Sequence, residues 1–144
     1  MASTPTPEIQ TDDDSRRLYK ALFHGETEEV LELCQKFSDG PFHVVTIHDD
    51  TVLHVAATTE QADLFLKLLH RVSKDQLNKL ILPNKGGNTI LHVASTLDKL
   101  VEAAKEMLTK APQLLYKRNS LDETPLYWSA IFGSRRYSSF FIMK

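Results

Sequence analysis

The stretch NTILHVA at residues 88–94 decides the fold, because the string TVLHVA at residues 51–56 repeats most of it. A third version, TPLYWS, occupies residues 124–129, with Tyr127 in place of the histidine and Ser129 in place of the alanine. The leading threonines at positions 51, 89 and 124 are 38 and then 35 residues apart. Self-similarity at a spacing of about 20 to 50 residues is typical of repeat architectures, so each copy is expected to begin one structural unit.

Composition and charge narrow the class of protein. The chain has 144 residues, 42% of them hydrophobic and 25% charged, which is enough to build one ordinary globular core. A net charge of −2 offers no basic surface for phosphates, so a nucleic-acid partner is not expected. No apolar run is long enough for a membrane span, and no signal peptide is visible. The single cysteine, Cys34, can form no internal disulfide, which favours a reducing compartment such as the cytoplasm.

The residues around the repeated strings predict pairs of helices. Small and apolar residues recur at i, i+3, i+4 and i+7, the spacing that places side chains on one helix face. This pattern is carried by Leu18, Ala21, Leu22 and Gly25, and again by Val30, Leu33, Cys34 and Phe37. We expect helix pairs at about 15–37, 52–70 and 90–111 and a partial pair from 125, in an all-α chain.

Turn-forming residues precede each threonine. The segments are HDD at 48–50, NKGGN at 84–88 and NSLDE at 119–123. Two positions before each threonine stand Asp49, Gly87 and Asp122, residue types that tolerate a positive φ. The threonine is expected to cap the following helix, and Pro125 suits the first helical position. His54 and His92 lie on the first helical turn, where the imidazole can bond to that threonine and to a neighbouring loop.

The segments outside the helix pairs receive separate predictions. Residues 1–14 combine two prolines with an acidic run, which predicts a disordered leader. The repeat domain is expected over 15–136, in units of about 15–47, 48–85, 86–120 and 121–136. Residues 73–84 predict an additional helical turn. Residues 137–144 form an atypical apolar tail, which we expect to cover the last helix incompletely and to leave a surface for self-association.

These residues resemble the ankyrin repeat. Its consensus of Thr-Pro-Leu-His, a variable residue, two alanines and a later glycine matches best in the second and third units. The matching positions are Thr51, Leu53, His54, Ala56 and Ala57; Gly87, Thr89, Leu91, His92 and Ala94; and Thr124, Pro125, Leu126, Ala130 and Gly133. The resemblance implies an ankyrin-repeat solenoid of about four helix-turn-helix units, the last one incomplete.

Two departures from the ankyrin pattern also carry expectations. Glu60 and Asp98 stand where the family usually has a glycine, so the turns between helices are expected to differ there. The long spacing, with the wording VLHVAA and GNTILHVAS, resembles plant ankyrin proteins that carry a C-terminal membrane domain. Such proteins are linked to defence, salt and stress signalling, and they are anchored in membranes. This chain includes no such membrane segment, so membrane attachment is not carried over to it.

The resemblance implies a non-catalytic module for protein–protein interaction, with a protein partner of unknown identity. Stacked repeats expose their loop tips and inner helices as one extended surface. The positions expected to touch a partner are His48, Asp50, Thr58, Thr59, Lys85, Asn88, Thr96, Leu97, Leu121 and Glu123. An alternative within this class is a fragment that self-associates with longer ankyrin proteins.

The sequence supports a catalytic or metal-binding function less well than an interaction module. His43, His48 and His54 are spaced by five and six residues, with no cysteine nearby, which disfavours a zinc site. Cys34 lies in an apolar stripe, which disfavours a nucleophile. Gly86 and Gly87 lack the lysine and serine of a phosphate loop. A hydrolase using scattered Ser, His and Asp residues remains the rival from another class, and we assign no catalytic, cofactor or metal residue.

Overall fold

The computed structural model describes residues 7–132, and this part of the chain is helical. The α-helices are α1 (Pro7–Phe23), α2 (Thr27–Cys34), α3 (Val52–Thr58), α4 (Ala62–His70), α5 (Ile90–Ala94), α6 (Val101–Lys110) and α7 (Pro125–Ile131). Short 3-10 helices are η1 (Gly40–Phe42), η2 (Lys74–Ile81), η3 (Asp98–Leu100) and η4 (Pro112–Tyr116). Residues 7–132 contain no strand, only an isolated antiparallel bridge between Val44 and Thr51. The expected all-α class is confirmed for these residues.

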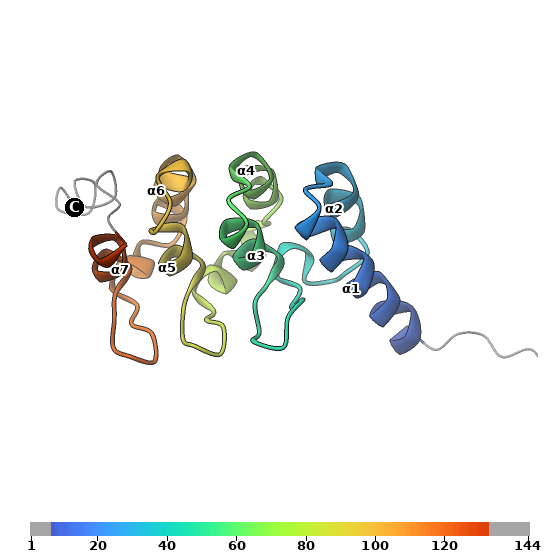
Figure 1. Cartoon of the computed structure of the whole chain (residues 1–144), viewed down its shortest axis with the longest axis horizontal. Coiled ribbons are helices and arrows are strands. Elements are labelled where there is room, and N and C mark those ends of the chain that lie inside the picture. The colour runs from blue at the N-terminus through green and yellow to red at the C-terminus, as the bar shows by residue number, and fades with distance from the viewer. Residues whose placement is uncertain (1–6, 133–144) are drawn as a thin grey trace, which may run out of the picture.

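The helices are arranged as neighbouring antiparallel pairs. Figure 1 shows α1, α3, α5 and α7 side by side in one row, and α2, α4 and α6 in a second row beside it. The loops that precede α3, α5 and α7 all project to the same side, away from the second row. The pairs α3–α4 and α5–α6 lie where the sequence predicted them, and η2 supplies the additional helical turn expected within residues 73–84.

The core runs continuously between the two rows of helices. Phe65, Leu68 and Leu69 of α4 are fully buried, and each side chain of this kind contributes about 1.5 to 3 kcal/mol relative to an exposed one. Ala56 and Ala94, both 0% exposed, keep α3 and α5 thin at their contacts, so that α3, α5 and α7 can approach one another. The small residues of the repeated string therefore set the spacing of the row.

The N-terminal boundary differs from the prediction. Helix α1 begins at Pro7, so residues 7–14 are helical instead of belonging to a disordered leader. A proline at the first helical position needs no N–H partner, so Pro7 suits the start of this helix. The Asp14 carboxylate also lies 3.6 Å from the Arg17 guanidinium and 3.9 Å from the Lys36 ammonium. Residues 1–6 of the predicted leader lie outside the described residues.

The turn between α3 and α4 corrects a second expectation. Glu60 has a φ of 59°, close to the 68° of Gly25 in the turn between α1 and α2. Both turns close with the same bonds: Gly25 N to Leu22 O and Glu26 N to Ala21 O in one, Glu60 N to Ala57 O and Gln61 N to Ala56 O in the other. The turn at Glu60 therefore keeps the glycine-type geometry. Only Asp98, which begins η3, gives a turn of different form, as expected.

The C-terminal expectations fall largely outside the described residues. Gly133, the end of the predicted fourth unit and the apolar tail at 137–144 all lie beyond residue 132. Within the described part, α7 follows the predicted start, with Thr124 as its cap and Pro125 at its first position.

Candidate functional site

The loops before α3, α5 and α7 share one backbone geometry. In each, the N–H of the fourth residue donates to the carbonyl of the first, at 3.2 Å for Asp49 to Thr46 and 2.9 Å for Gly87 to Asn84. The third loop repeats this bond between Asp122 and Asn119 at 2.9 Å. The fourth residue has a positive φ in every case, 62° at Asp49, 78° at Gly87 and 65° at Asp122. These are the three positions that the sequence predicted.

A side-chain oxygen at the first position holds each loop from inside. Asn84 Oδ1 accepts from the backbone N–H groups of Gly86 and Asn88, both at 3.0 Å. Asn119 Oδ1 does the same in the third loop, and Thr46 Oγ1 takes this role in the first. Because such Asx and Ser/Thr turns satisfy otherwise free donors, the loops are ordered without a partner.

Hydrogen bonds between successive loops form what we call the loop ladder. Its backbone bonds run from Lys85 N to His48 O at 2.8 Å and from Ser120 N to Gly86 O at 3.0 Å. Its side-chain bonds run from Asn84 Nδ2 to Asp50 Oδ1 at 2.8 Å and from Asn119 Nδ2 to Asn88 Oδ1 at 2.9 Å. The ladder joins the three loop tips into one row.

Gly87 permits the close approach of the second and third loops. A Cβ atom at this position would lie 2.5 Å from Ser120 N and 3.0 Å from the Asn119 carbonyl carbon. Both are backbone atoms of the third loop, and neither can rotate away. The glycine is therefore required by its neighbour as well as by its own positive φ.

The two histidines of the repeated string tie each inner helix to the next loop. His54 Nδ1 lies 3.2 Å from the Thr51 backbone N–H and 2.9 Å from the Thr51 hydroxyl, while its Nε2 lies 3.0 Å from the Asn88 carbonyl oxygen. A backbone N–H can only donate, so Nδ1 is unprotonated and Nε2 carries the proton that it donates to the carbonyl. His92 repeats the arrangement with Thr89 and Glu123 O, the latter at 2.7 Å. The hydrogen bonds expected for both histidines are present.

Burial favours the neutral form of these imidazoles. His54 and His92 are both 0% exposed, and desolvation lowers the pKa of each below its ordinary value, against the opposing effect of the backbone carbonyl each one bonds. Protonation of Nδ1 would also break its bond from the threonine N–H. Both histidines therefore act as neutral structural links.

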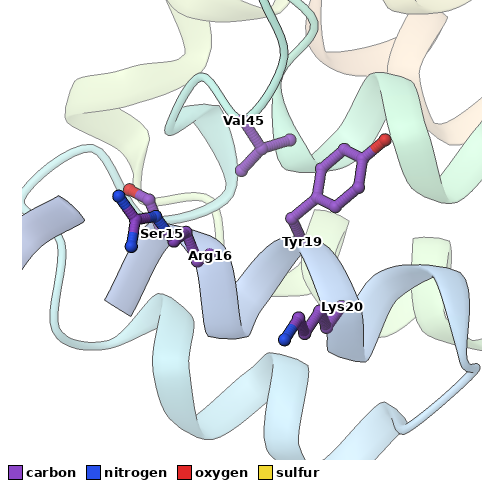
Figure 2. A pocket seen from close by; sticks show the side chains of 5 residues that line it. All are labelled: Ser15, Arg16, Tyr19, Lys20 and Val45. Atoms are coloured by element: carbon purple, nitrogen blue, oxygen red, sulfur yellow. The ribbon is translucent and has the colours of Figure 1, made fainter. Parts of the chain in front are cut away.

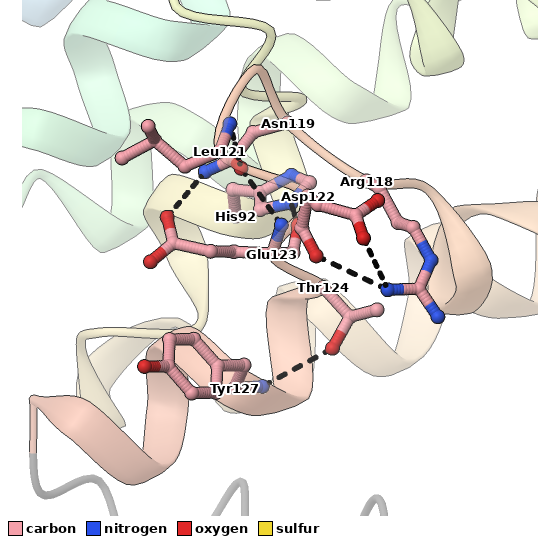
Figure 3. A network of polar contacts seen from close by, with 8 residues as sticks. All are labelled: His92, Arg118, Asn119, Leu121, Asp122, Glu123, Thr124 and Tyr127. Atoms are coloured by element: carbon pink, nitrogen blue, oxygen red, sulfur yellow. Dashed lines mark hydrogen bonds and ion pairs between the residues drawn. The ribbon is translucent and has the colours of Figure 1, made fainter.

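The third loop carries the densest polar network, which Figure 3 shows around Asn119. The Glu123 carboxylate accepts from Asn119 Nδ2 at 2.8 Å and from Trp128 Nε1 at 2.9 Å, and these two bonds hold the pKa of Glu123 below its usual value. Arg118 Nη1 donates to the Asp122 carbonyl oxygen at 3.1 Å. This loop is held by its own residues and by α7.

The residues predicted to bind a partner differ in whether their side chains are exposed or form contacts within the chain. His48, Lys85 and Leu121 are exposed at the loop tips, and Thr58 is exposed at the end of α3. The remaining loop positions, Asp50, Asn88 and Glu123, bond within or between loops. Farther from the tips, the hydroxyls of Thr58, Thr59 and Thr96 donate to carbonyls of their own helices, and Leu97 packs on the core.

Sequence reasoning missed several exposed apolar residues on the loop side. Ile47 is 81% exposed at the first loop tip, and its loop position matches that of Lys85. Tyr19, 42% exposed, stands 35 residues before His54, and Tyr127, 50% exposed, stands 35 residues after His92. The repeat register places Tyr127 in the histidine position, and the same register could have identified Tyr19 and Ile47, because each matches a position discussed in another unit.

Residues considered for catalysis or metal binding from the sequence have structural surroundings of their own. No group of three or more His, Cys, Asp or Glu side chains within residues 7–132 is arranged to hold a metal ion. His43 bonds Ser15 Oγ at 2.8 Å and stacks on Phe37 at 3.7 Å between ring centroids. Burial raises the pKa of Cys34 to about 12, against a smaller lowering by Arg71, so the thiol is protonated at neutral pH. Among the helices of this part of the chain, none has the length and apolarity that a bilayer crossing needs.

No protein-family model matches the chain, and no curated protein matches it in sequence. The chain's own residues and geometry therefore carry the functional argument.

Proposed function

We propose that this chain is a non-catalytic protein–protein interaction module built from ankyrin-type repeats. The support is the recurrence of one unit: a loop with a positive-φ residue before a capping threonine and a short inner helix, followed after α3 and α5 by a second helix packed against it. Repeats of this kind contact mainly their neighbours and present an extended surface on one side. The ankyrin assignment rests on the residues of the repeated strings.

The observation that carries the proposal is the loop ladder. It holds the tips of three loops in a row before any partner arrives, and a preformed surface avoids part of the ordering cost of binding. The ladder uses backbone atoms at the tips and side chains behind them, so the tip side chains Ile47, Lys85 and Leu121 stay exposed. An extended row of mixed apolar and charged tips suits a protein surface better than a small molecule.

The biological setting follows from the resemblance in sequence. We place the chain in a plant signalling, stress or defence protein whose longer relatives are anchored in membranes, and we place this part in the cytoplasm. The lone buried thiol of Cys34 is compatible with that reducing compartment.

A variant pair tests the interaction function. The tip variant Ile47→Asp, Lys85→Glu, Leu121→Asp changes only exposed side chains, while the control Asp63→Lys, Lys67→Glu, Lys110→Glu changes exposed residues of the second row. Immobilised wild-type protein is exposed to plant extract, and captured proteins are compared by mass spectrometry. Proteins retained by the wild type and the control but lost from the tip variant are expected. If both variants retain the same proteins, the loop tips are not the binding surface.

A second candidate is self-association through α7. Leu126, Tyr127 and Ile131 of α7 and the adjacent Phe132 are 37%, 50%, 59% and 59% exposed, so exposed apolar side chains cluster on and beside this helix. Exposed apolar surface of this kind marks interaction sites. Sedimentation at tens of micromolar should show dimers that the variant Ile131→Ser, Phe132→Ser abolishes. Tyr116→Ser, which changes a residue 74% exposed elsewhere, is the control. A monomeric wild type would exclude this candidate.

A further inference from the structure

The loop ladder leaves one backbone donor open at its N-terminal end. In the second and third loops, the N–H of the second residue (Lys85 and Ser120) donates to the preceding loop. The corresponding residue of the first loop is Ile47, and residues 7–45 form no earlier loop of this kind. Among the residues that the structure describes, the Ile47 N–H has no acceptor, and its side chain is 81% exposed. An extended chain laid beside this loop could continue the ladder in the same way.

A hollow lies between α1 and the start of the first loop, and one of its lining residues, Val45, stands two residues before Ile47. It is lined by Ser15, Arg16, Tyr19 and Lys20 of α1 and by Val45 of the first loop, as Figure 2 shows. Its volume is about 290 Å³. Ligand pockets usually run from about 300 to 1,000 Å³, so the hollow suits one or two side chains of a peptide.

The hollow exists because the first unit departs from the repeat. In the next two units, a histidine bridges the inner helix to the following loop. The first unit has Tyr19 at this position, and no hydrogen bond joins it to the first loop within residues 7–132. Tyr19 is 42% exposed, and the space beside its ring is left open between α1 and Val45.

Charge identifies what the hollow would accept. Arg16 and Lys20 are one helical turn apart on α1 and both line the hollow, so its helical wall is cationic. Two nearby carboxylates are engaged elsewhere: Asp14 with Arg17 and Lys36, and Asp50 with Thr46 and Asn84. Lys20, which is exposed, takes no part in the ion pairs between described residues. A ligand here meets the apolar surface of Tyr19 and Val45 beside the Lys20 ammonium group.

We propose that an extended acidic peptide segment of a partner protein docks at this end. A backbone carbonyl of the segment accepts from the Ile47 N–H, an aliphatic side chain enters between Tyr19 and Val45, and a carboxylate lies beside Lys20. This inference rests on the proposed protein-binding function and names one part of the surface and the chemistry it selects.

A random heptapeptide library displayed on phage provides the test. Selection on the wild-type protein should enrich peptides with Asp or Glu within two residues of Leu, Ile or Val. Synthetic copies of the enriched peptides are then measured by fluorescence polarisation against the wild type, Lys20→Glu and Tyr19→Ser. Lys67→Glu, which reverses an exposed lysine of α4, is the matched control. Circular dichroism confirms that each variant is folded.

The expected results separate this site from the function in general. Lys20→Glu should weaken binding on the order of fivefold, more at low salt than at high salt, while Lys67→Glu leaves it unchanged. Tyr19→Ser should weaken it as well, and the Ile47 amide resonance of ¹⁵N-labelled protein should shift when peptide is added. Enriched peptides with no excess of acidic residues, or equal binding to Lys20→Glu, would overturn the proposal. If such peptides are instead lost on Lys85→Glu or Leu121→Asp, protein binding stands and only this site fails.

Discussion

Replacing Gly87 by alanine tests whether close contact between loops holds the row together. The added Cβ would lie 2.5 Å from Ser120 N, a separation that side-chain Cβ atoms do not reach, so one loop must move. The same residue has a φ of 78°, where a Cβ is unfavourable by about 1 to 2 kcal/mol.

The size of the effect follows from the contacts that must separate. Moving the third loop away stretches the bonds from Ser120 N to Gly86 O and from Asn119 Nδ2 to Asn88 Oδ1, each worth about 0.5 to 1.5 kcal/mol. With the backbone strain, the free energy of unfolding should fall by about 2 to 5 kcal/mol. Domains of this size are stable by only about 5 to 15 kcal/mol, so the loss would be large.

Urea unfolding followed by circular dichroism measures the change, and Gly86→Ala is the matched control. A Cβ at Gly86 meets only the side chains of Asn88 at 3.2 Å and Asn84 at 3.5 Å, and the φ of Gly86 is not positive. Its cost should stay below about 1 kcal/mol. If Gly87→Ala unfolds within about 0.5 kcal/mol of the wild type, or if both variants lose the same amount, the reasoning from loop contact is wrong.

Three further predictions concern the turns and the histidines. Glu60→Gly should raise stability by about 0.5 to 1 kcal/mol in urea unfolding, because Glu60 is exposed at a φ of 59°; Glu60→Ala, which removes the carboxylate but keeps the Cβ, should not. His92→Ala should lower stability by about 1 to 3 kcal/mol by leaving Thr89 N and Glu123 O unpaired, and added zinc should not change the melting temperature of the wild type. Burial lowers the pKa of His54 and His92 in the folded chain. The unfolded chain therefore binds more protons than the folded chain below about pH 6.5. The free energy of unfolding should then decline as the pH falls below this value. The slope should reach at most about 1.4 kcal/mol per pH unit for each histidine, and a flat profile from pH 7 to 5 would contradict it.

The sequence predicted the structure best at positions where a residue type has a specific local role, such as capping a helix or adopting a positive φ. Threonine before an apolar helical string predicted the caps at Thr51, Thr89 and Thr124, because a hydroxyl accepts from the orphan N–H groups of a first turn. Asp49, Gly87 and Asp122 predicted the positive-φ positions for a similar reason. Local chemistry decides these features, so local sequence was sufficient.

Prediction failed where a distant contact or a competing preference decides the structure. Glutamate is an unfavourable residue type for a positive φ, yet Glu60 adopts one because the packing of α3 on α4 holds the turn closed. The start of α1 was placed too late, because the ion pairs of Asp14 with Arg17 and Lys36 bring together side chains that a composition argument treats as a solvated run. The bonds of Asp50 and Asn88 to the next loop were missed for the same reason, since each partner is 31 or 34 residues away in the chain.

In each loop, some positions form hydrogen bonds through their side chains and others only through their backbone. This difference explains how the surface could change its partner without losing its fold. The first and fifth loop positions, such as Asn84 and Asn88, use their side chains for bonds within the loop or to the next one. The second and third positions contribute only a backbone N–H or carbonyl to the ladder. Their side chains accordingly differ without pattern: Ile47 and His48 in the first loop, Lys85 and Gly86 in the second, Ser120 and Leu121 in the third. Substitution at the second or third loop position should therefore alter binding with little effect on stability. Substitution at the first or fifth position should instead lower stability.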